Sequence, residues 1–282
     1  MELPERIEHY YERLTKREKL VANYVRQHQR EVLALTLSEL AEHAGVSETT
    51  VFRFCRSIKL EGYQAFKMAL ALCTNNKHML DAGTNVNIAL SANSHEVCEK
   101  VLSVYQSALQ KAFGQLDYAA IDRTVDALLN ARLISLFGFS GSGIAAALMQ
   151  NKFAKILPNV ICFSDAHMQL TNAALLKAGD VCFVFCNSGI TIDAIHIAEL
   201  AHAAGAFTIF ATSLPTTPAA ASCDIILPCG APEGPMQGGS ISVLASQLYT
   251  VDVLYAEAFR RLGPQAVLSK EKTAQAITHK ML

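Results

Sequence analysis

The chain has 282 residues, of which 51% are hydrophobic and 17% are charged, and its formal net charge is −1. This composition excludes a disordered protein and a uniformly basic nucleic-acid coat, and the length suits two domains that each bury a core. The N-terminus is charged and has no apolar signal core, and no apolar run is long enough to cross a bilayer. We therefore expect a cytoplasmic protein that does not contact a membrane.

The first 77 residues show helical periodicity. Thr15 is followed three residues later by Glu18, which is the spacing of a capping box at the start of a helix. The same spacing recurs at Thr36 and Glu39. Apolar residues then follow every three or four positions, so each helix has one face to bury. We predict an all-α domain over residues 1–77.

A tight turn joins two of these helices. The helix after Thr36 stops near Gly45, and the next begins with Ser47 as its N-cap, which is the arrangement of a helix-turn-helix. The second helix of such a pair reads base edges, and nearby basic side chains contact phosphates. The predicted base-contacting residues are Ser47, Glu48, Thr49, Thr50 and Arg53, and the predicted phosphate-contacting residues are Arg56, Lys59 and Lys67. The alternative is a helical bundle in which these polar residues are only solvated.

The chain changes character after the helical region. An Asn-, Ser- and Thr-rich stretch predicts a linker over residues 78–95, and two amphipathic helices follow it. From residue 133, apolar runs alternate with helical segments, which is typical of a parallel sheet covered on both faces. The runs expected to form strands are LISLFGF, VICFS, DVCFVFC, FTIFAT and DIILP, and a long helix follows them. We predict a doubly wound, five-stranded parallel α/β domain over residues 96–282.

The eight cysteines form no Cys-x-x-Cys pair, and most lie inside apolar runs. This distribution favours buried free thiols over a metal or redox site. We expect no metal ion and no cofactor.

Two of the predicted strand ends carry small and hydroxyl-bearing residues before a helix begins. The first loop is GFSGSG, in which Ser140, Gly141 and Ser142 lie between Gly138 and Gly143, and the second is CNSGIT, with Asn187, Ser188, Gly189 and Thr191. Backbone amides, hydroxyls and helix N-termini together bind anions, and phosphate fits best. A plain tight turn is the alternative for either loop alone. A nicotinamide-dependent dehydrogenase is disfavoured, because the G-x-G-x-x-G fingerprint is absent, and the loop also lacks the lysine of a P-loop nucleotide site.

The segments LTLSELAEHAGVSETTVFRFCRSIKLEGYQAFKMAL, GFSGSG, SDAHMQL and SGIT together resemble the RpiR family of bacterial transcription regulators. The second half of the chain resembles the sugar isomerase (SIS) domain, and the resemblance covers roughly residues 5 to 265. It implies a regulator, not an enzyme, whose operator binding is controlled by a phosphosugar. It also implies a homodimer or homotetramer on a palindromic operator, and the apolar helices around 96–129 and 240–262 are candidate subunit contacts.

The resemblance assigns the phosphate to Ser142, Ser188, Gly189 and Thr191. The sequence departs from the family pattern at Ser140, where a glycine is usual, and at Cys186, where a serine is usual.

The sugar end would be contacted by Asp165 and His167 after the second strand and by Glu233 and Ser240 before the last long helix. SIS enzymes use a Glu or a His for proton transfer. The alternative function is therefore a phosphosugar isomerase or etherase with an accessory helical domain, in which Glu233 and His167 would act.

Overall fold

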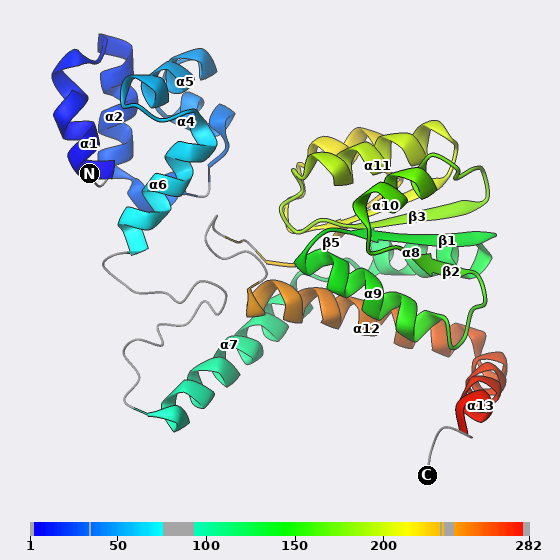
Figure 1. Cartoon of the computed structure of the whole chain (residues 1–282). Helices are drawn as coiled ribbons and strands as arrows, with labels where there is room; N and C mark the ends of the chain where they lie inside the picture. Colours follow the sequence, from blue (N-terminus) through cyan, green and yellow to red (C-terminus); the bar gives the residue numbers. More distant parts are fainter. Residues whose placement is uncertain (1–2, 34, 76–92, 232, 234–239, 279–282) are drawn as a thin grey trace. The chain divides into compact units, whose positions relative to one another are not determined.

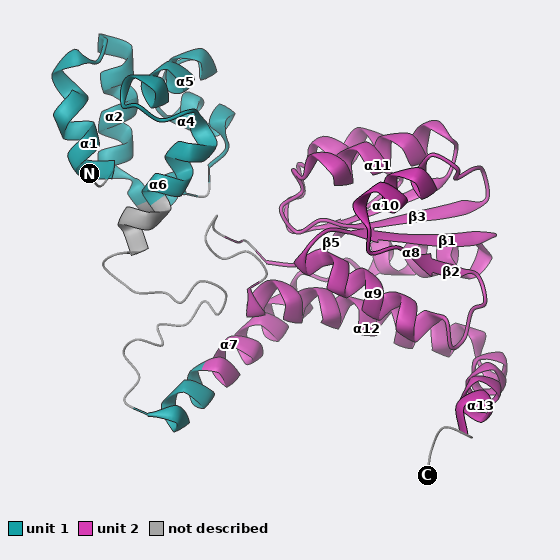
Figure 2. Ribbon diagram, in the orientation of Figure 1, with its two compact units in different colours: residues 1–100, 234–238 teal, residues 101–233, 239–282 magenta. Residues whose placement is uncertain are grey.

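The computed structural model describes residues 3–33, 35–75, 93–231, 233 and 240–278 (Figure 1). These residues form two compact units, of which the first extends to Lys100 and the second begins at Val101 (Figure 2). The division falls inside helix α7 (Ser94–Gly114), so the domain start at residue 96 stays a prediction. Most of the predicted linker, 78–95, lies outside the described residues.

The first unit is helical, as predicted. Apolar residues from its helices form one core, in which Val21, Leu40, Val51, Phe54 and Phe66 are fully buried. The elements are α1 (Leu3–Tyr10), η1 (Tyr11–Arg13), α2 (Lys16–Gln27), α3 (Gln29–Val32), α4 (Leu37–His43), α5 (Glu48–Ser57) and α6 (Tyr63–Asn75).

Both predicted capping boxes are confirmed. In the first, the amide of Glu18 donates to the Thr15 hydroxyl at 3.3 Å and the amide of Thr15 donates to the Glu18 carboxylate at 2.8 Å. Glu18 is only 5% exposed and also accepts a bond from Ser57 of α5 at 2.9 Å. Burial alone would raise the pKa of Glu18, but the bonds from Thr15 and Ser57 outweigh it and hold that pKa below its ordinary value. The cap of α2 thus also fixes α5.

The turn between α4 and α5 is built around Gly45, whose φ of +66° is a conformation that favours glycine. Ser47 is the N-cap residue of α5, as predicted, but its hydroxyl lies 3.0 Å from the Thr50 hydroxyl and makes no bond to the helix backbone. The helix-turn-helix is therefore present over α4 and α5, with a different capping bond from the one expected.

The second unit contains a five-stranded sheet in the order β2-β1-β3-β4-β5, and all neighbouring strands pair in parallel. This confirms the predicted doubly wound α/β fold and all five predicted strands. In chain order the elements after α7 are α8 (Tyr118–Asn130), β1 (Leu133–Gly138), α9 (Gly141–Phe153), β2 (Val160–Cys162), α10 (Ala166–Ala173), β3 (Asp180–Phe185), α11 (Ile192–Ala203), β4 (Phe207–Thr212), η3 (Pro218–Ser222), β5 (Ile225–Pro228), α12 (Ile241–Leu262) and α13 (Pro264–Thr278).

Helices cover both faces of the sheet (Figure 1). Leu136 of β1 packs in the core shared with α8, α9 and α12, whereas its neighbour Phe137 packs in the core shared with α10 and α11. Successive residues of a strand point to opposite faces, so a strand that is apolar without interruption suits a sheet between two layers. Among the described residues, no helix combines the length and apolarity needed to cross a membrane.

Buried cysteines belong to these cores. Cys55, Cys182, Cys186 and Cys229 are free and buried. Burial raises the pKa of the Cys55 and Cys229 thiols to about 12, so neither is a thiolate near neutral pH. No group of three metal-binding side chains occurs in the ranges given above.

An ion-pair network joins the end of α12 to α8. Arg261 contacts Glu257 at 2.6 Å and Asp126 at 2.6 Å, and it also contacts Asp122. Hydrogen bonds from Arg260 and Arg261 lower the pKa of Glu257 to about 2. The folded state therefore binds the Glu257 proton more weakly than the unfolded chain does.

This difference predicts part of the acid sensitivity of the α/β unit. The contribution of Glu257 is fully present above about pH 4.5, the ordinary pKa of a glutamate, and is lost as the pH falls toward 2. We expect Glu257→Gln to flatten the fall of the free energy of unfolding over this range, measured by urea unfolding at a series of pH values. Glu271→Gln, at an exposed position on α13, is the control and should keep the wild-type slope. Equal slopes for both variants would contradict the prediction.

Candidate functional site

Sheet topology places the two predicted anion loops next to each other. β1 pairs with β2 on one side and with β3 on the other, and Gly138 at the end of β1 lies opposite Phe185 at the end of β3. The chain leaves these two strands in opposite directions around the sheet, and ligands of doubly wound folds bind at such a switch point. The loops lead into α9 and α11, whose N-termini carry positive partial charge.

The first loop is tightly folded. A side chain at Gly138 would place its Cβ 2.6 Å from the carbonyl oxygen of Ser142, so only glycine fits there. The buried side chain of Gln169, on α10, bonds the same backbone in both directions. Its Oε1 accepts from the Gly138 amide at 3.0 Å, and its Nε2 donates to the Gly138 carbonyl at 3.1 Å. The SDAHMQL segment therefore fixes the first loop through Gln169.

Ser140 has an unusual backbone. Its φ of +51° and ψ of −127° lie in a region that favours glycine. Ser140 is the N-cap residue of α9, but its side chain makes no capping bond, and it is exposed. The serine therefore adds backbone strain without a local bond to offset it.

Ser142 lies in the first turn of α9 and is half-buried. Its hydroxyl oxygen accepts a hydrogen bond of 3.0 Å from Nε2 of Gln247, on α12. Gln247 is fully buried. This contact joins residues 105 positions apart and ties the first loop to the last long helix.

The second loop is organised by Asn187, which is 8% exposed. Its backbone carbonyl accepts bonds from the Ser213 amide at 3.1 Å and the Thr212 hydroxyl at 3.2 Å. Its side-chain amide pairs with the backbone of Ala231, donating at 3.0 Å and accepting at 3.1 Å. A Cβ at Gly230 would lie 2.1 Å from Asn187 Oδ1, so this pairing requires glycine. The structure gives Asn187 a bracing role, and ligand contact stays a prediction.

Hydroxyls remain accessible in the second loop. Ser188 and Thr191 are both exposed, and their hydroxyl oxygens lie 3.4 Å apart. Gly189 between them has a φ of +68°, which turns the backbone into α11. Cys186 is buried, and its sulfur lies 3.8 Å from the Ser188 hydroxyl. The thiol thus lies below the loop and leaves the exposed hydroxyls in place.

The residues predicted for the sugar end fall into two groups. Asp165 caps α10 by accepting from the Met168 amide at 2.9 Å, and Asp165 and His167 are both exposed. Ser240 is fully buried and caps α12, and its amide donates to Glu233 at 2.7 Å. We therefore leave Ser240 out of the proposed ligand contacts.

Most of the predicted DNA-contacting residues are exposed along α5 and beside its ends. Ser47, Thr49, Arg53, Arg56 and Lys59 are exposed, and Thr50 is half-buried. The Arg56 guanidinium lies 5.4 Å from the centre of the exposed Phe52 ring, which holds it against the helix. Basic side chains and small hydroxyls are therefore both accessible on α5.

Two predicted DNA contacts are engaged within the domain instead. The Glu48 carboxylate accepts a bond of 2.5 Å from Ser38 of α4, which locks the two helices of the motif together. The Lys67 ammonium donates to the Leu35 carbonyl at 2.8 Å, and burial lowers the pKa of Lys67. We therefore assign Glu48 and Lys67 to the structure of the domain and leave both out of the proposed DNA surface.

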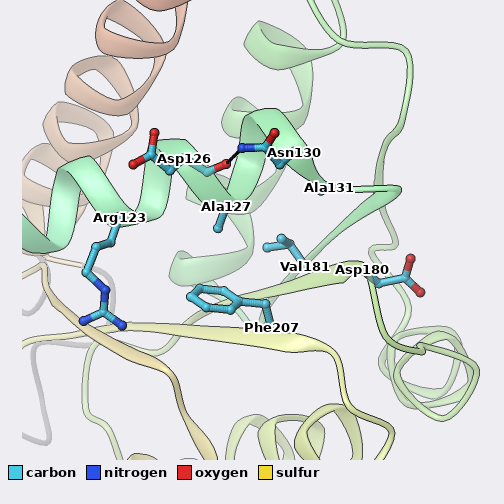
Figure 3. A pocket seen from close by; sticks show the side chains of 9 residues that line it. Arg123, Asp126, Ala127, Asn130, Ala131, Asp180, Val181 and Phe207 are labelled. Carbon is cyan, nitrogen blue, oxygen red and sulfur yellow. Dashed lines mark hydrogen bonds between the residues drawn. The ribbon is translucent and has the colours of Figure 1, made fainter.

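A separate pocket of about 430 Å³ lies where β3 and β4 begin, at the strand ends opposite to those that carry the paired loops (Figure 3). It is lined by α8 and by the first residues of β3 and β4, including Asp180 and Phe207. None of the residues predicted to bind a ligand lines it. It is therefore distinct from the paired loops.

Sequence reasoning missed Gln169 and Gln247. Both are buried glutamines on helices that pack against the sheet, and a glutamine among apolar residues was the available signal. A buried amide requires partners, but the sequence does not say which backbone or hydroxyl supplies them.

Comparison with known proteins covers both halves of the chain. Residues 1–77 match the model of the helix-turn-helix domain of the rpiR family, and residues 127–257 match the SIS domain. An uncharacterized HTH-type transcriptional regulator of Haemophilus influenzae is 31% identical over 268 residues, which are 95% of this chain and 93% of that protein. A bifunctional protein glk of Burkholderia thailandensis is 30% identical over 269 residues, but the match spans only 41% of its length.

Solved structures also resemble this chain. The NanR protein of Vibrio vulnificus, complexed with ManNAc-6P, is 26% identical, covers 99% of each chain and superposes with a TM-score of 0.79. The sugar isomerase domain of an RpiR transcription factor from Sphaerobacter thermophilus covers 62% of this chain and 96% of its own, with a TM-score of 0.55 and 19% identity. The second match supports the fold of the α/β unit alone.

The strained backbone of Ser140 generates a prediction. Ser140→Gly should raise the free energy of unfolding by about 1 kcal/mol, because relief of a glycine-favoured conformation outweighs the added freedom of the unfolded chain. Urea unfolding of the full chain measures this change. Ser107→Gly, at an exposed position in the middle of α7, should instead destabilise. A Ser140→Gly protein that is less stable than the wild type would show that the serine is not strained.

Proposed function

The chain belongs to the RpiR family of helix-turn-helix transcriptional regulators, and we propose that a sugar phosphate bound in its SIS domain controls its affinity for operator DNA. The observation that carries this proposal is the pairing of two hydroxyl-bearing loops at the switch point between β1 and β3. This site occurs in the same chain as a helix-turn-helix whose second helix exposes Arg53 and Arg56. A sensor and a DNA-binding module in one chain suit a regulated transcription factor.

The proposed effector is a sugar phosphate whose phosphate group lies between the two loops. Ser142, Ser188 and Thr191 would donate hydroxyl hydrogen bonds, and the N-termini of α9 and α11 would add positive potential. The amide of Gly189 donates to the Cys186 carbonyl at 3.0 Å, so Gly189 would shape the loop. Exposed Asp165 and His167 would face the sugar. The complex of NanR with ManNAc-6P supports a phosphorylated sugar as the class of ligand.

We propose that the site binds its ligand without transforming it. Glu233, one of the two candidates for proton transfer, accepts from the Ser240 amide at 2.7 Å and from the Asn187 side chain at 3.5 Å. Both carboxylate oxygens are therefore engaged in holding the second loop to the start of α12. The HTH-type regulators among the relatives support the same role.

The proposed assembly is a homodimer, or a tetramer of two dimers, on palindromic DNA in the bacterial cytoplasm. α7 supports it, because Leu102, Tyr105, Leu109 and Phe113 form an exposed apolar stripe along one face of the helix. We propose that this stripe packs against a second copy. α12 is a weaker candidate, because it packs Val251, Leu254 and Ala258 against its own sheet.

DNA binding by α5 is tested with the full-length protein and its operator. Arg53→Ala should weaken operator binding at least tenfold and reduce its salt dependence, because a major-groove or phosphate contact is lost. Fluorescence anisotropy at several salt concentrations measures both. Lys67→Met is the matched control and should change operator affinity little, since its ammonium bonds within the domain. Loss of binding in Lys67→Met alone, or one chain per operator by light scattering, would contradict the proposal.

Effector binding is tested by thermal shift with a panel of hexose and amino-sugar 6-phosphates. At least one should stabilise the wild type in proportion to RT ln(1 + [L]/Kd), whereas its unphosphorylated sugar should not. Ser188→Ala should weaken this ligand at least tenfold, because one charge-assisted hydrogen bond is lost. Ser107→Ala, on the exposed face of α7, should bind as the wild type does. Conversion of the sugar phosphate to another isomer would instead favour the enzyme.

A further inference from the structure

Gln247 is a fully buried polar residue on α12, and within the described residues only one of the two polar atoms of its side-chain amide makes a hydrogen bond. Its Nε2 donates to the Ser142 hydroxyl oxygen at 3.0 Å. Its Oε1 is buried and has no hydrogen-bond partner among the residues that the structure describes. A buried carbonyl oxygen without a partner destabilises the folded state, so stability alone does not account for a glutamine at this position.

The direction of this bond decides what Ser142 offers to a ligand. A hydroxyl that accepts from Gln247 keeps its own proton for a second partner. Across the described part of the chain, no other group bonds the Ser142 hydroxyl. The proton is therefore available at the first turn of α9, where the helix dipole favours an anion. A phosphate oxygen is an acceptor only, whereas a sugar hydroxyl both donates and accepts.

We propose that Gln247 is a positioning residue that fixes Ser142 as a hydrogen-bond donor and so selects phosphate in the first loop. The amide holds the serine hydroxyl in one orientation before the ligand arrives, which reduces the ordering that binding would otherwise require. The inference rests on the proposed function, because it assumes that the anion binds at Ser142. Its consequence is that α12, far along the chain, contributes to recognition through Ser142.

The test compares Gln247→Met with the wild type in the full-length protein. Methionine fills a similar volume but cannot donate, so affinity for ManNAc-6P, measured by isothermal titration calorimetry, should fall about tenfold. The melting temperature without ligand should stay the same or rise, because the unpartnered carbonyl oxygen is removed. Gln247→Asn, whose shorter side chain cannot reach Ser142, should show the same loss of affinity. Thr250→Val, which removes another buried polar group from α12, should bind as the wild type does.

A double-mutant cycle separates positioning from a general structural role. In a Ser142→Ala background, Gln247→Met should cause no further loss of affinity, since the group that it orients is already absent. Losses that multiply, or a Gln247→Met protein that binds as tightly as the wild type, would overturn the inference and leave the proposed function intact. If the wild type binds neither inorganic phosphate nor any sugar phosphate of the thermal-shift panel, both the inference and the proposed function are wrong.

Discussion

Parallel pairing of β1 with strands on both sides constrains the whole α/β unit. Because Gly138 and Phe185 end their strands side by side, the two loops that follow start from neighbouring points and must turn into helices on opposite faces of the sheet. The tight turn at Gly138 and the left-handed turn at Gly189 follow from this requirement. The N-termini of α9 and α11 therefore follow neighbouring strand ends, and the two loops that lead into them contain no lysine or arginine.

Distant side chains hold these loops in place. Gln169 fixes the first loop from α10, Gln247 bonds its serine from α12, and Asn187 braces the second loop against Ala231. Short loops such as these do not gain rigidity from their own sequences alone. The buried amides supply it, because each lost bond would leave a polar group unsatisfied in a low-dielectric interior.

The spacing of residues in the sequence predicted the helices and strands well. It did not predict the partners of polar side chains, because contacts between distant segments determine them. The capping boxes at Thr15 and Thr36, the turn at Gly45 and all five strands depend on residues close in sequence, so periodicity and caps were sufficient to place them. The engagement of Lys67 with Leu35 and the burial of Ser240 could not be predicted, because both depend on how remote segments pack. The sequence alone does not distinguish a polar residue that contacts a ligand from one that bonds a backbone carbonyl group.

The separation between Ser142 and Gln247 also sets an order of events during synthesis. Among the described residues, the buried core of the helical unit ends at Leu70, whereas the first loop gains its α12 partner only 105 residues after Ser142 is made. At ribosomal rates of about 5–20 residues per second, that interval is roughly 5–20 s. A growing chain therefore contains the buried core residues of its helical unit well before the hydroxyl of Ser142 can gain its partner on α12, so this loop is among the last parts of the chain to reach its final form.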